Sequence, residues 1–363
     1  MGGLVLQVIT DTDRRGAQTF ALDLEEALVA CGLRVRTVAL APGRSPNSHD
    51  APVLGRRRLT GRTLLALRPL IRDASVVVAH GSTTLPACVL AGTGLSTALV
   101  YRNIGDPLYW AHSPARRIRV RTLLRRTAAV VALWRGSSEV LASRFDVARS
   151  RLHVIPNGVP STRCTVSPPE HRREARRSLG LDPATPTAAY VGALSREKSL
   201  HLAISASRDL GTQLLLAGDG PLRLDLESQA RSQAPGLVRF LGVVSDPAVV
   251  YAAADLVVLP SESEGMPGML IEAGLSGLGA VASDVGAVRE VIANGRTGVV
   301  ISPGNKSSLA QGLEQGFTNA EQFGVAARIR CLERFEITPV ASAWQRLLTP
   351  FLPTTHGARA WSR

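Results

Sequence analysis

The chain has 363 residues, enough for two domains that each bury a full core. Hydrophobic residues make up 45% of it and aromatic residues only 4%, which favours an α/β fold with a core of Ala, Val, Leu and Ile. The net charge is +13, and the four widely spaced cysteines argue against a zinc site or a disulfide framework and fit a reducing cytoplasm.

The first apolar run, from Met1 to Thr10, is too short for a signal sequence and predicts a strand. Residues 17–30 follow with apolar residues at helical spacing and predict a helix that ends at Gly32. The longest weakly polar stretch, residues 85–101, is interrupted by Pro86, Gly92 and Gly94, so it predicts a helix, a turn and a strand. No membrane crossing is predicted, and a cytoplasmic location is expected.

Short β-branched runs alternate with amphipathic stretches in both halves of the chain, the pattern of two doubly wound parallel sheets. The first half predicts strands at 4–9, 34–40, 75–79, 97–101, 128–133 and 152–155. Residues 160–177 lack apolar periodicity and predict a linker near residue 163. The second half predicts strands at 187–191, 213–217, 238–241, 256–259, 280–283 and 298–301.

The excess positive charge lies entirely in residues 1–163, which contain 23 arginines, no lysine and 10 acidic residues. Two segments concentrate it, with arginines at 56, 57, 58, 62, 68 and 72 and at 116, 117, 119, 121, 125 and 126. Such a face could meet an anionic lipid surface or a phosphorylated ligand, or it could be a solvated surface of arginine-biased composition. No nucleic-acid motif accompanies the charge, so no nucleic-acid partner is expected.

The segment from Leu259 to Ala273, LPSESEGMPGMLIEA, is the most informative part of the sequence. A strand ends there, a polar glycine-containing loop follows, and an apolar helix begins near Met269. The free backbone N–H groups at a helix start favour an anion such as a diphosphate. Glu264 in the loop and Glu272 in the helix would repel that anion, so each is expected to accept hydrogen bonds from hydroxyls.

Two glutamates at this spacing after a strand resemble the signature of the family 4 retaining glycosyltransferases, the glycosyl transferases group 1, whose fold is called GT-B. Further segments of the same pattern are VIPNGV (154–159), YVGALSREKS (190–199), LLLAGDGPLR (214–223), VRFLGVVSD (238–246) and SDVGAVREVIANGRTGVVISPGN (283–305). The resemblance implies two Rossmann-like domains facing a cleft. It also implies an acceptor-side domain at 1–163, a nucleotide-sugar domain at 164–338, and a helix and tail at 339–363 that pack back toward the first domain.

Carried over by position, the resemblance assigns the donor site in this half. Glu264 would contact the donor sugar, Glu272 the ribose diol, and Lys198 the diphosphate. The backbone of Gly265, Met266, Pro267, Gly268, Met269 and Leu270 would bind the phosphates. Lys198 also stands out by itself, because the chain has only two lysines against 40 arginines. Lys198 and Glu264 are thus the expected catalytic residues. The family's usual arginine is replaced by Ala193, and Arg196 is the nearest substitute.

Two other motifs carry weaker signals. Gly218-Asp219-Gly220 lacks the third glycine of a dinucleotide-binding loop and predicts a turn beside the nucleotide. Asp11 and Asp13 resemble the metal-binding pair of other sugar transferases but follow the first strand, where the resemblance places no metal. No metal and no cofactor are expected.

In the N-terminal half the resemblance is carried by the layout and by Gly16, which matches one glycine of a family loop that lets the backbone approach the substrates. The family's histidine next to the reacting carbon is missing, and Arg102 and Asn103 stand there instead. They either bind the acceptor or cap the next segment. His80 at a strand end, and Tyr109 with Trp110 as a stacking platform, are further acceptor-side candidates, each with a structural alternative.

The resemblance implies a retaining transferase of hexosyl type. It would move a sugar from a nucleotide-diphosphate donor to an unidentified acceptor, anionic or lipid-linked if the arginine-rich half is functional. In that case the protein would work at the inner face of a membrane. Two alternatives stay open: an inactive relative that binds nucleotide sugars as a scaffold, and a sugar-nucleotide epimerase of the same fold.

Overall fold

The computed structural model describes residues 3–43, 48–110 and 113–353. The chain forms two units, of which unit 1 comprises the described residues up to Gly158 and from Ile337 onward, and unit 2 runs from Val159 to Glu336. The sequence suggested boundaries at 163 and 338. Val159 goes with unit 2 because its N–H donates to the carbonyl of Phe335 (2.9 Å).

Unit 1 is built on a six-stranded parallel sheet in the order β2-β1-β3-β4-β5-β6. Its strands are β1 (Leu4–Ile9), β2 (Arg34–Ala39), β3 (Val76–His80), β4 (Ala98–Asn103), β5 (Ala129–Ala132) and β6 (Leu152–Val154). Strands β3, β4 and β5 are buried almost throughout, as continuous apolar runs in a parallel sheet should be. All six lie where the sequence predicted them, with ends shifted by at most two residues.

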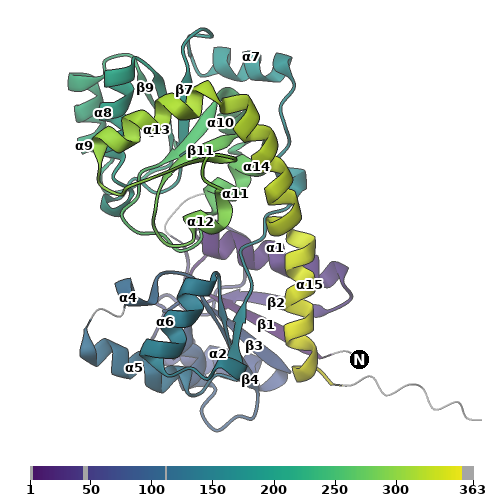
Figure 1. The fold of residues 1–363 in the computed structure, drawn as a ribbon. Helices are drawn as coiled ribbons and strands as arrows, with labels where there is room; N and C mark the ends of the chain where they lie inside the picture. Colours follow the sequence, from purple (N-terminus) through teal and green to yellow (C-terminus); the bar gives the residue numbers. More distant parts are fainter. Residues whose placement is uncertain (1–2, 44–47, 111–112, 354–363) are drawn as a thin grey trace, which may run out of the picture. The chain divides into compact units, whose positions relative to one another are not determined.

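Helices cover both faces of this sheet. They are α1 (Gly16–Ala30), α2 (Gly61–Asp73), α3 (Thr84–Ala91), α4 (Pro107–Trp110), α5 (Pro114–Leu124), α6 (Arg135–Phe145) and α15 (Ile337–Leu348). One face packs on α2, α3, α5 and α6, and the other on α1 and α15. The last helix thus belongs to the core of unit 1, where it lies beside α1 (Figure 1).

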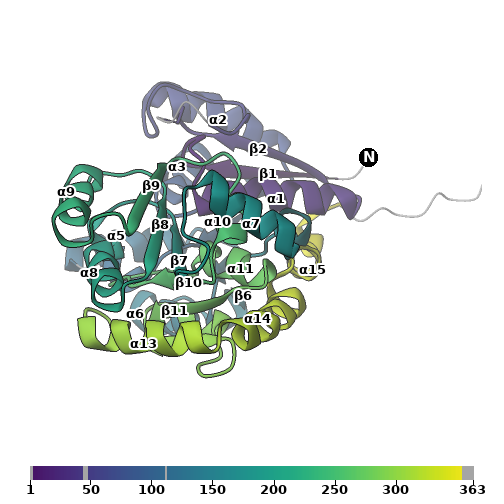
Figure 2. The same cartoon turned by 90° about the horizontal axis from the view of Figure 1, so that it is seen from above.

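Unit 2 repeats the plan with the order β12-β11-β10-β7-β8-β9. Its strands are β7 (Thr187–Val191), β8 (Gln213–Ala217), β9 (Val238–Gly242), β10 (Leu256–Leu259), β11 (Gly279–Ser283) and β12 (Gly298–Ile301). Its helices are α7 (Pro169–Ser178), α8 (Leu200–Leu210), α9 (Arg223–Gln233), α10 (Ala248–Ala253), α11 (Gly268–Leu275), α12 (Val288–Val291), α13 (Lys306–Thr318) and α14 (Ala320–Phe335). The sheet lies between α13 and the α7–α10 pair (Figure 2).

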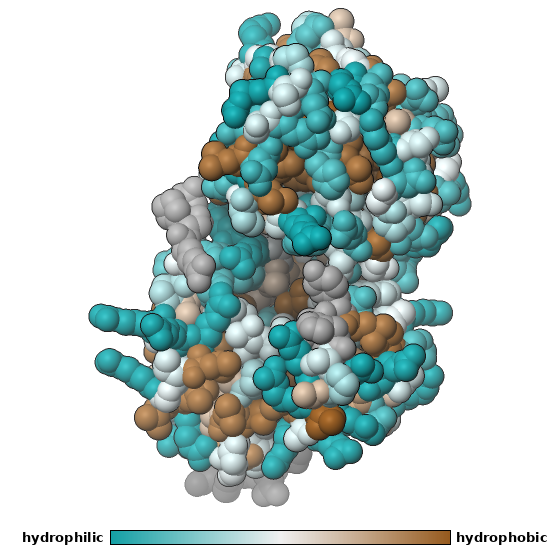
Figure 3. Space-filling view, turned by 90° about the vertical axis from the view of Figure 1, so that its left-hand side faces the viewer, coloured by the Kyte–Doolittle hydropathy of each residue, from teal (hydrophilic) through white to brown (hydrophobic). Residues whose placement is uncertain are grey.

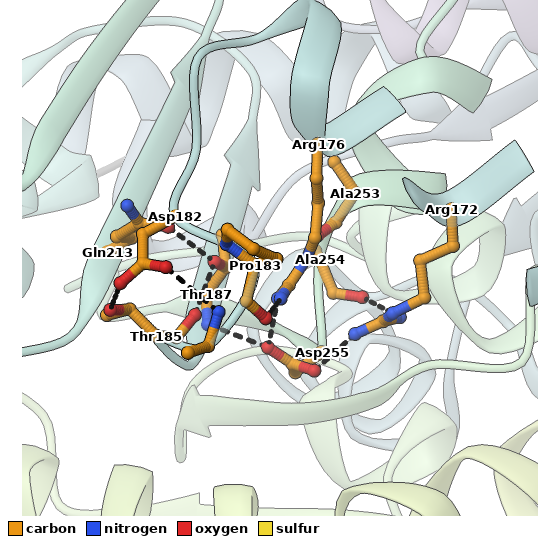
Figure 4. A network of polar contacts seen from close by, with 11 residues as sticks. Arg172, Arg176, Asp182, Pro183, Thr185, Thr187, Gln213, Ala253, Ala254 and Asp255 are labelled. Carbon is orange, nitrogen blue, oxygen red and sulfur yellow. Dashed lines mark hydrogen bonds and ion pairs between the residues drawn. The ribbon is translucent and has the colours of Figure 1, made fainter. Parts of the chain in front are cut away.

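Helix α7 corrects the sequence interpretation, which took residues 160–177 for a linker. The helix is fastened by charge instead of an apolar stripe (Figure 4). Arg176 donates to Asp255 (2.7 Å) and to the carbonyls of Ala253 (2.9 Å) and Pro183 (2.8 Å). Arg172 forms a second ion pair with Asp255. Because arginine stems and hydrogen bonds do the packing, no apolar periodicity is visible in the sequence.

Among the described residues, no helix is both long and apolar enough to span a membrane.

Candidate functional site

Two loops of unit 2 meet where the strand order reverses. β7, the first strand, lies between β8 and β10, so the chain leaves the sheet centre in opposite directions after β7 and after β10. In doubly wound sheets this switch point at the carboxyl ends of the strands is where ligands bind. The loops are joined directly, since the Glu262 N–H donates to the Glu197 carbonyl (2.8 Å) and Ser199 Oγ to Glu262 Oε1 (3.2 Å).

This junction brings Lys198 and Glu264 together. Lys198 Nζ lies 2.6 Å from Glu264 Oε1, and the two side chains are 18% and 9% exposed. Ser261 Oγ donates to the same carboxylate oxygen (2.7 Å). Both side chains are partly buried, so their pairing offsets part of the desolvation cost that each charge would have alone. Both residues were predicted from the sequence, and the structure adds their direct contact.

Glu272 is held by a different element. It lies within α11, and its Oε2 accepts a 2.8 Å hydrogen bond from the hydroxyl of Tyr251 on α10. Burial, followed by the charge of Glu272, raises the pKa of Tyr251 well above its usual value, so the phenol stays protonated as the donor. Nothing in the sequence pointed to Tyr251, because a tyrosine on a short apolar helix normally indicates core packing.

The loop before α11 has a fixed shape. The Ala287 N–H donates to the Gly265 carbonyl (2.8 Å), and Gly286, with a φ of 54°, lies so close that a Cβ there would be 2.2 Å from the Glu264 carbonyl oxygen. Met266 and Pro267 are buried, and Pro267 provides no side-chain cap for α11. Of the first N–H groups of this helix, that of Leu270 donates to the Pro267 carbonyl (3.2 Å). N–H groups at a helix start that lack such a partner favour an anion.

The glycines of Gly218-Asp219-Gly220 serve backbone packing. A Cβ on Gly218, whose φ is 137°, would lie 1.8 Å from the Gly192 carbonyl oxygen, and one on Gly220 would lie 2.4 Å from that of Leu194. The Leu194 N–H also donates to the Asp219 carbonyl (3.0 Å). This turn thus supports the loop that carries Lys198. In that loop Ala193 and Arg196 are both exposed.

In unit 1 the acceptor-side candidates form an internal network. The Gln7 side-chain amide donates to the Ala21 carbonyl (2.8 Å), which orients its oxygen toward His80 Nε2 (2.9 Å). His80 Nδ1 then faces Arg102 Nη1 (3.3 Å) and must accept, because a guanidinium only donates. His80 is therefore a neutral imidazole with both nitrogens occupied. Burial and then the Arg102 charge lower its pKa well below the usual range.

Arg102 and Asn103 differ from their predicted setting. The sequence placed them after a strand, whereas β4 continues through both, and both are fully buried. Arg102 donates to Asn157 and its guanidinium lies 3.9 Å from the centre of the Phe20 ring. Burial lowers the pKa of Arg102 to about 9, which leaves it charged at neutral pH. Asn103 donates to Gly105 O (2.8 Å) and Ser137 Oγ (3.0 Å).

A pocket of about 270 Å³ opens at the carboxyl end of the unit 1 sheet. It lies between the ends of β1 and β3, the switch point of this sheet. Its lining is Ile9, Thr10, Ala17, Gln18, His80, Gly81, Ser82, Thr83, Tyr101, Ile104 and Gly105. Gln18, Ser82 and Thr83 were not predicted from the sequence, although the position of Ser82 and Thr83 shortly after the end of β3 was a usable signal.

The remaining predicted residues lie near this edge or outside the described part. Gly16 is the exposed first residue of α1, and a Cβ there would meet no atom within 4 Å. The side chains of Tyr109 and Trp110 lie outside the described residues. Asp11 is buried against Arg58 (2.6 Å) and Gln18 (2.8 Å), so its carboxylate is committed to protein partners.

Comparison with known proteins gives matches to two family models. Residues 14–163 match the model described as Glycosyltransferase Family 4, and residues 185–319 match Glycosyl transferases group 1. Alpha-maltose-1-phosphate synthase of Mycolicibacterium smegmatis is 28% identical over 61% of this chain and 62% of its own. D-inositol 3-phosphate glycosyltransferase of Nocardia farcinica is 31% identical over 52% of this chain and 44% of its own. The chain thus spans less than two thirds of these relatives.

A solved structure extends the likeness to nearly the whole chain. Anabaena Alr3699/HepE in complex with UDP-glucose superposes with a TM-score of 0.85 at 20% identity, covering 96% of this chain and all of that one. At this identity the likeness shows the fold, which is the predicted GT-B architecture of two Rossmann-like domains. The two family models cover most of the sequence between them, and the chain belongs to the family 4, or group 1, glycosyltransferases.

Proposed function

We propose that this protein is a retaining hexosyltransferase that takes its sugar from a nucleotide-diphosphate donor. The observation that carries the proposal is the Lys198–Glu264 pair at the switch point of unit 2, beside the start of α11. A partly buried cation, a carboxylate and a helix start provide groups for a diphosphate and for sugar hydroxyls within one loop junction. The UDP-glucose complex of HepE makes a uridine diphosphate sugar the first donor to test.

Each donor-site residue has a proposed role. Glu264 accepts hydrogen bonds from the transferred sugar and Glu272 from the ribose. The backbone from Gly265 to Leu270 binds the phosphates, and Lys198 neutralises them. Gly16 leaves room for the substrates, and the exposed Arg196 is the candidate to replace the guanidinium that Ala193 lacks.

The proposed reaction breaks the bond between the anomeric carbon and the β-phosphate oxygen. Negative charge grows on the departing diphosphate, which Lys198 and N–H groups at the start of α11 would stabilise. The acceptor hydroxyl attacks from the same face, and its proton passes to the departing phosphate oxygen. Because this charge is neutralised by the protein, the proposal includes no cofactor and no metal, and EDTA should leave the rate unchanged.

The acceptor is proposed to bind unit 1 at the pocket beside His80. Since both nitrogens of His80 are occupied and its pKa is lowered, its role would be to shape the pocket, not to take a proton. Arg102 and Asn103, buried on β4, would support the His80 side of the pocket from within the core. Tyr109 and Trp110 remain proposed acceptor contacts.

An anionic or lipid-linked acceptor at the inner face of a membrane is proposed from the charge of α5. No acidic residue occurs between Asp106 and Glu139. Ile118 on α5 is 66% exposed between Arg117 and Arg119. In the view of Figure 3, apolar side chains lie among polar ones on the surface of unit 1. An apolar residue flanked by arginines fits an anionic lipid surface.

Sedimentation with phosphatidylglycerol vesicles at low salt tests this location. The double change Arg116→Glu and Arg119→Glu should abolish binding. The same change at two exposed arginines of unit 2, Arg177 and Arg231, should have a smaller effect. Failure of the wild-type protein to bind anionic vesicles would end the membrane proposal and leave the transferase proposal intact.

The inactive-relative alternative is favoured by two observations: the absence of a guanidinium at Ala193, and the absence of the family's histidine where Arg102 and Asn103 stand. The unfolding temperature measured with UDP, GDP, ADP and dTDP sugars tests the transferase and the inactive-relative hypotheses, with Glu272→Ala and Lys198→Ala as controls. A ligand at a hundredfold excess over its dissociation constant adds about 2.7 kcal/mol to the stability. A shift for one base that both variants lose supports the transferase site. Nucleotide-sugar binding with no turnover across many acceptors supports a scaffold. Turnover of the donor without an acceptor supports an epimerase. No shift of the unfolding temperature with any nucleotide sugar refutes the donor site.

A further inference from the structure

The two donor-site carboxylates of unit 2 are held by unlike partners. Glu264 forms an ion pair with Lys198, and in the proposed reaction that cation also faces the diphosphate. Glu272 accepts from the hydroxyl of Tyr251 (2.8 Å). Tyr251 has no assigned part in binding or chemistry, yet it donates directly to the group proposed to bind the ribose.

Tyr251 is buried in a well-packed helix, which restricts the position of its side chain. Its side chain is 2% exposed, and α10, which carries it, packs on α7 and on β7. The Tyr251 hydroxyl donates to Oε2 of Glu272, and its raised pKa keeps it protonated as that donor. Glu272 in turn lies on α11 with rotatable bonds of its own. Removing the phenol hydroxyl takes away the hydrogen bond that orients Oε2 of this carboxylate.

The Cys164 thiol also lies close enough to Glu272 for the carboxylate to affect its pKa. Burial raises the pKa of the nearby Cys164 thiol to about 12, with Glu272 the next contributor, so the thiol is neutral. A half-buried carboxylate in such surroundings favours hydrogen-bond donors, and a vicinal diol supplies two.

We propose that Tyr251 is a positioning residue that sets the ribose selectivity of the donor site by orienting Glu272. The inference rests on the proposed function, since it needs a nucleotide in this site. The ligand feature that it selects is the pair of ribose hydroxyls. Tyr251 touches neither the reacting sugar nor the diphosphate.

The test compares a ribonucleotide with a matched analogue that lacks the diol. Calorimetric dissociation constants are measured for UDP and 2′,3′-dideoxy-UDP, or for the same pair with the base that the panel selects. Tyr251→Phe removes only the hydroxyl, and Glu272→Ala removes the carboxylate. The matched control is Tyr190→Phe, because Tyr190 is also a buried tyrosine of unit 2 but donates to a backbone carbonyl, that of Ala193 (2.9 Å).

The expected result is a three- to tenfold loss of UDP affinity in Tyr251→Phe, with the dideoxy analogue binding as in the wild type. The ribose preference of the variant then approaches that of Glu272→Ala, while Tyr190→Phe keeps the wild-type preference. An equal loss for both ligands would show a merely structural tyrosine, and unchanged binding would show no role. Either result overturns the inference.

Failure of the proposed function has a different signature. If the wild-type protein binds no nucleotide, the donor site itself is refuted and the inference falls with it. If the wild type prefers ribose but Glu272→Ala keeps that preference, Glu272 is not the ribose ligand, and the inference is overturned while nucleotide binding stands.

Discussion

Replacing Asp255 by alanine should destabilise unit 2 without touching the donor site. Asp255 precedes β10 at the amino edge of the sheet (Figure 4). Its carboxylate pairs with Arg172 and Arg176 and accepts from the Thr187 N–H (2.7 Å). Glu264 follows the other end of the same strand. Four residues of β10 separate the two edges by about 13 Å at roughly 3.3 Å per residue.

The magnitude follows from the burial of each partner. Arg176 is 8% exposed, and a buried charge that loses its partner costs about 3–5 kcal/mol. Arg172 is 34% exposed and can rehydrate, so its pair contributes about 0–1 kcal/mol. The carbonyls of Ala253 and Pro183 still solvate Arg176 in the variant. The expected net loss is therefore about 2–4 kcal/mol, or about 4–16 °C in Tm for a unit of this size.

Asp209→Ala is the matched control in the same unit. Asp209 also pairs with two cations, Arg208 and Lys306, but these side chains are 42% and 45% exposed. Its loss should cost no more than about 1 kcal/mol. Urea unfolding and nucleotide binding are measured on both variants. A loss in Asp255→Ala no larger than that in the control would refute the argument from burial, and weaker nucleotide binding by the folded variant would refute the separation of the two edges.

Three further predictions concern other parts of the chain. The free energy of unfolding should fall as the pH drops below 6.5, because the pKa of His80 is lower in the folded than in the unfolded state. In urea titrations His80→Gln should make this fall less steep by up to about 1.4 kcal/mol per pH unit, and parallel plots of unfolding free energy against pH for the two proteins would contradict it. In native thiol labelling only the half-buried Cys31 should react quickly, since the other three thiols are buried with raised pKa values, and fast labelling of a second cysteine would contradict this. Gly218→Ala should cost roughly 2–4 kcal/mol in urea unfolding, whereas Gly236→Ala, also at positive φ but with open space around it, should cost about 1 kcal/mol; equal losses would show that the approach to Gly192 relaxes freely.

The strands were predictable because parallel sheets bury both faces. Strands such as β3, β8 and β10 are therefore continuous apolar runs that need no knowledge of their neighbours. Lys198 and Glu264 could also be singled out, one as a rare lysine and the other from its place after a strand. Their roles remain proposals, but their positions in loops follow from local sequence.

What the sequence did not reveal depends on partners far apart in the chain. α7 looked like a linker because its contacts are arginine hydrogen bonds to residues about 80 positions away. Arg102 looked like a loop residue because nothing local shows that His80 and Asn157 accept its donors inside the core. The hydroxyl of Tyr251 reaches Glu272 only when α10 and α11 are folded.

The sequence by itself determined the local elements, their order and the residue types at the strand ends, since these follow from hydrophobic pattern and backbone preference. Only the tertiary structure decided which side chains are paired. It placed α15 in the core of unit 1 and showed that His80, an acceptor-side candidate, is a neutral imidazole with both ring nitrogens hydrogen-bonded. Hydrogen bonds and desolvation depend on distances of a few ångström between distant segments, and such distances exist only once the sheets and helices have packed.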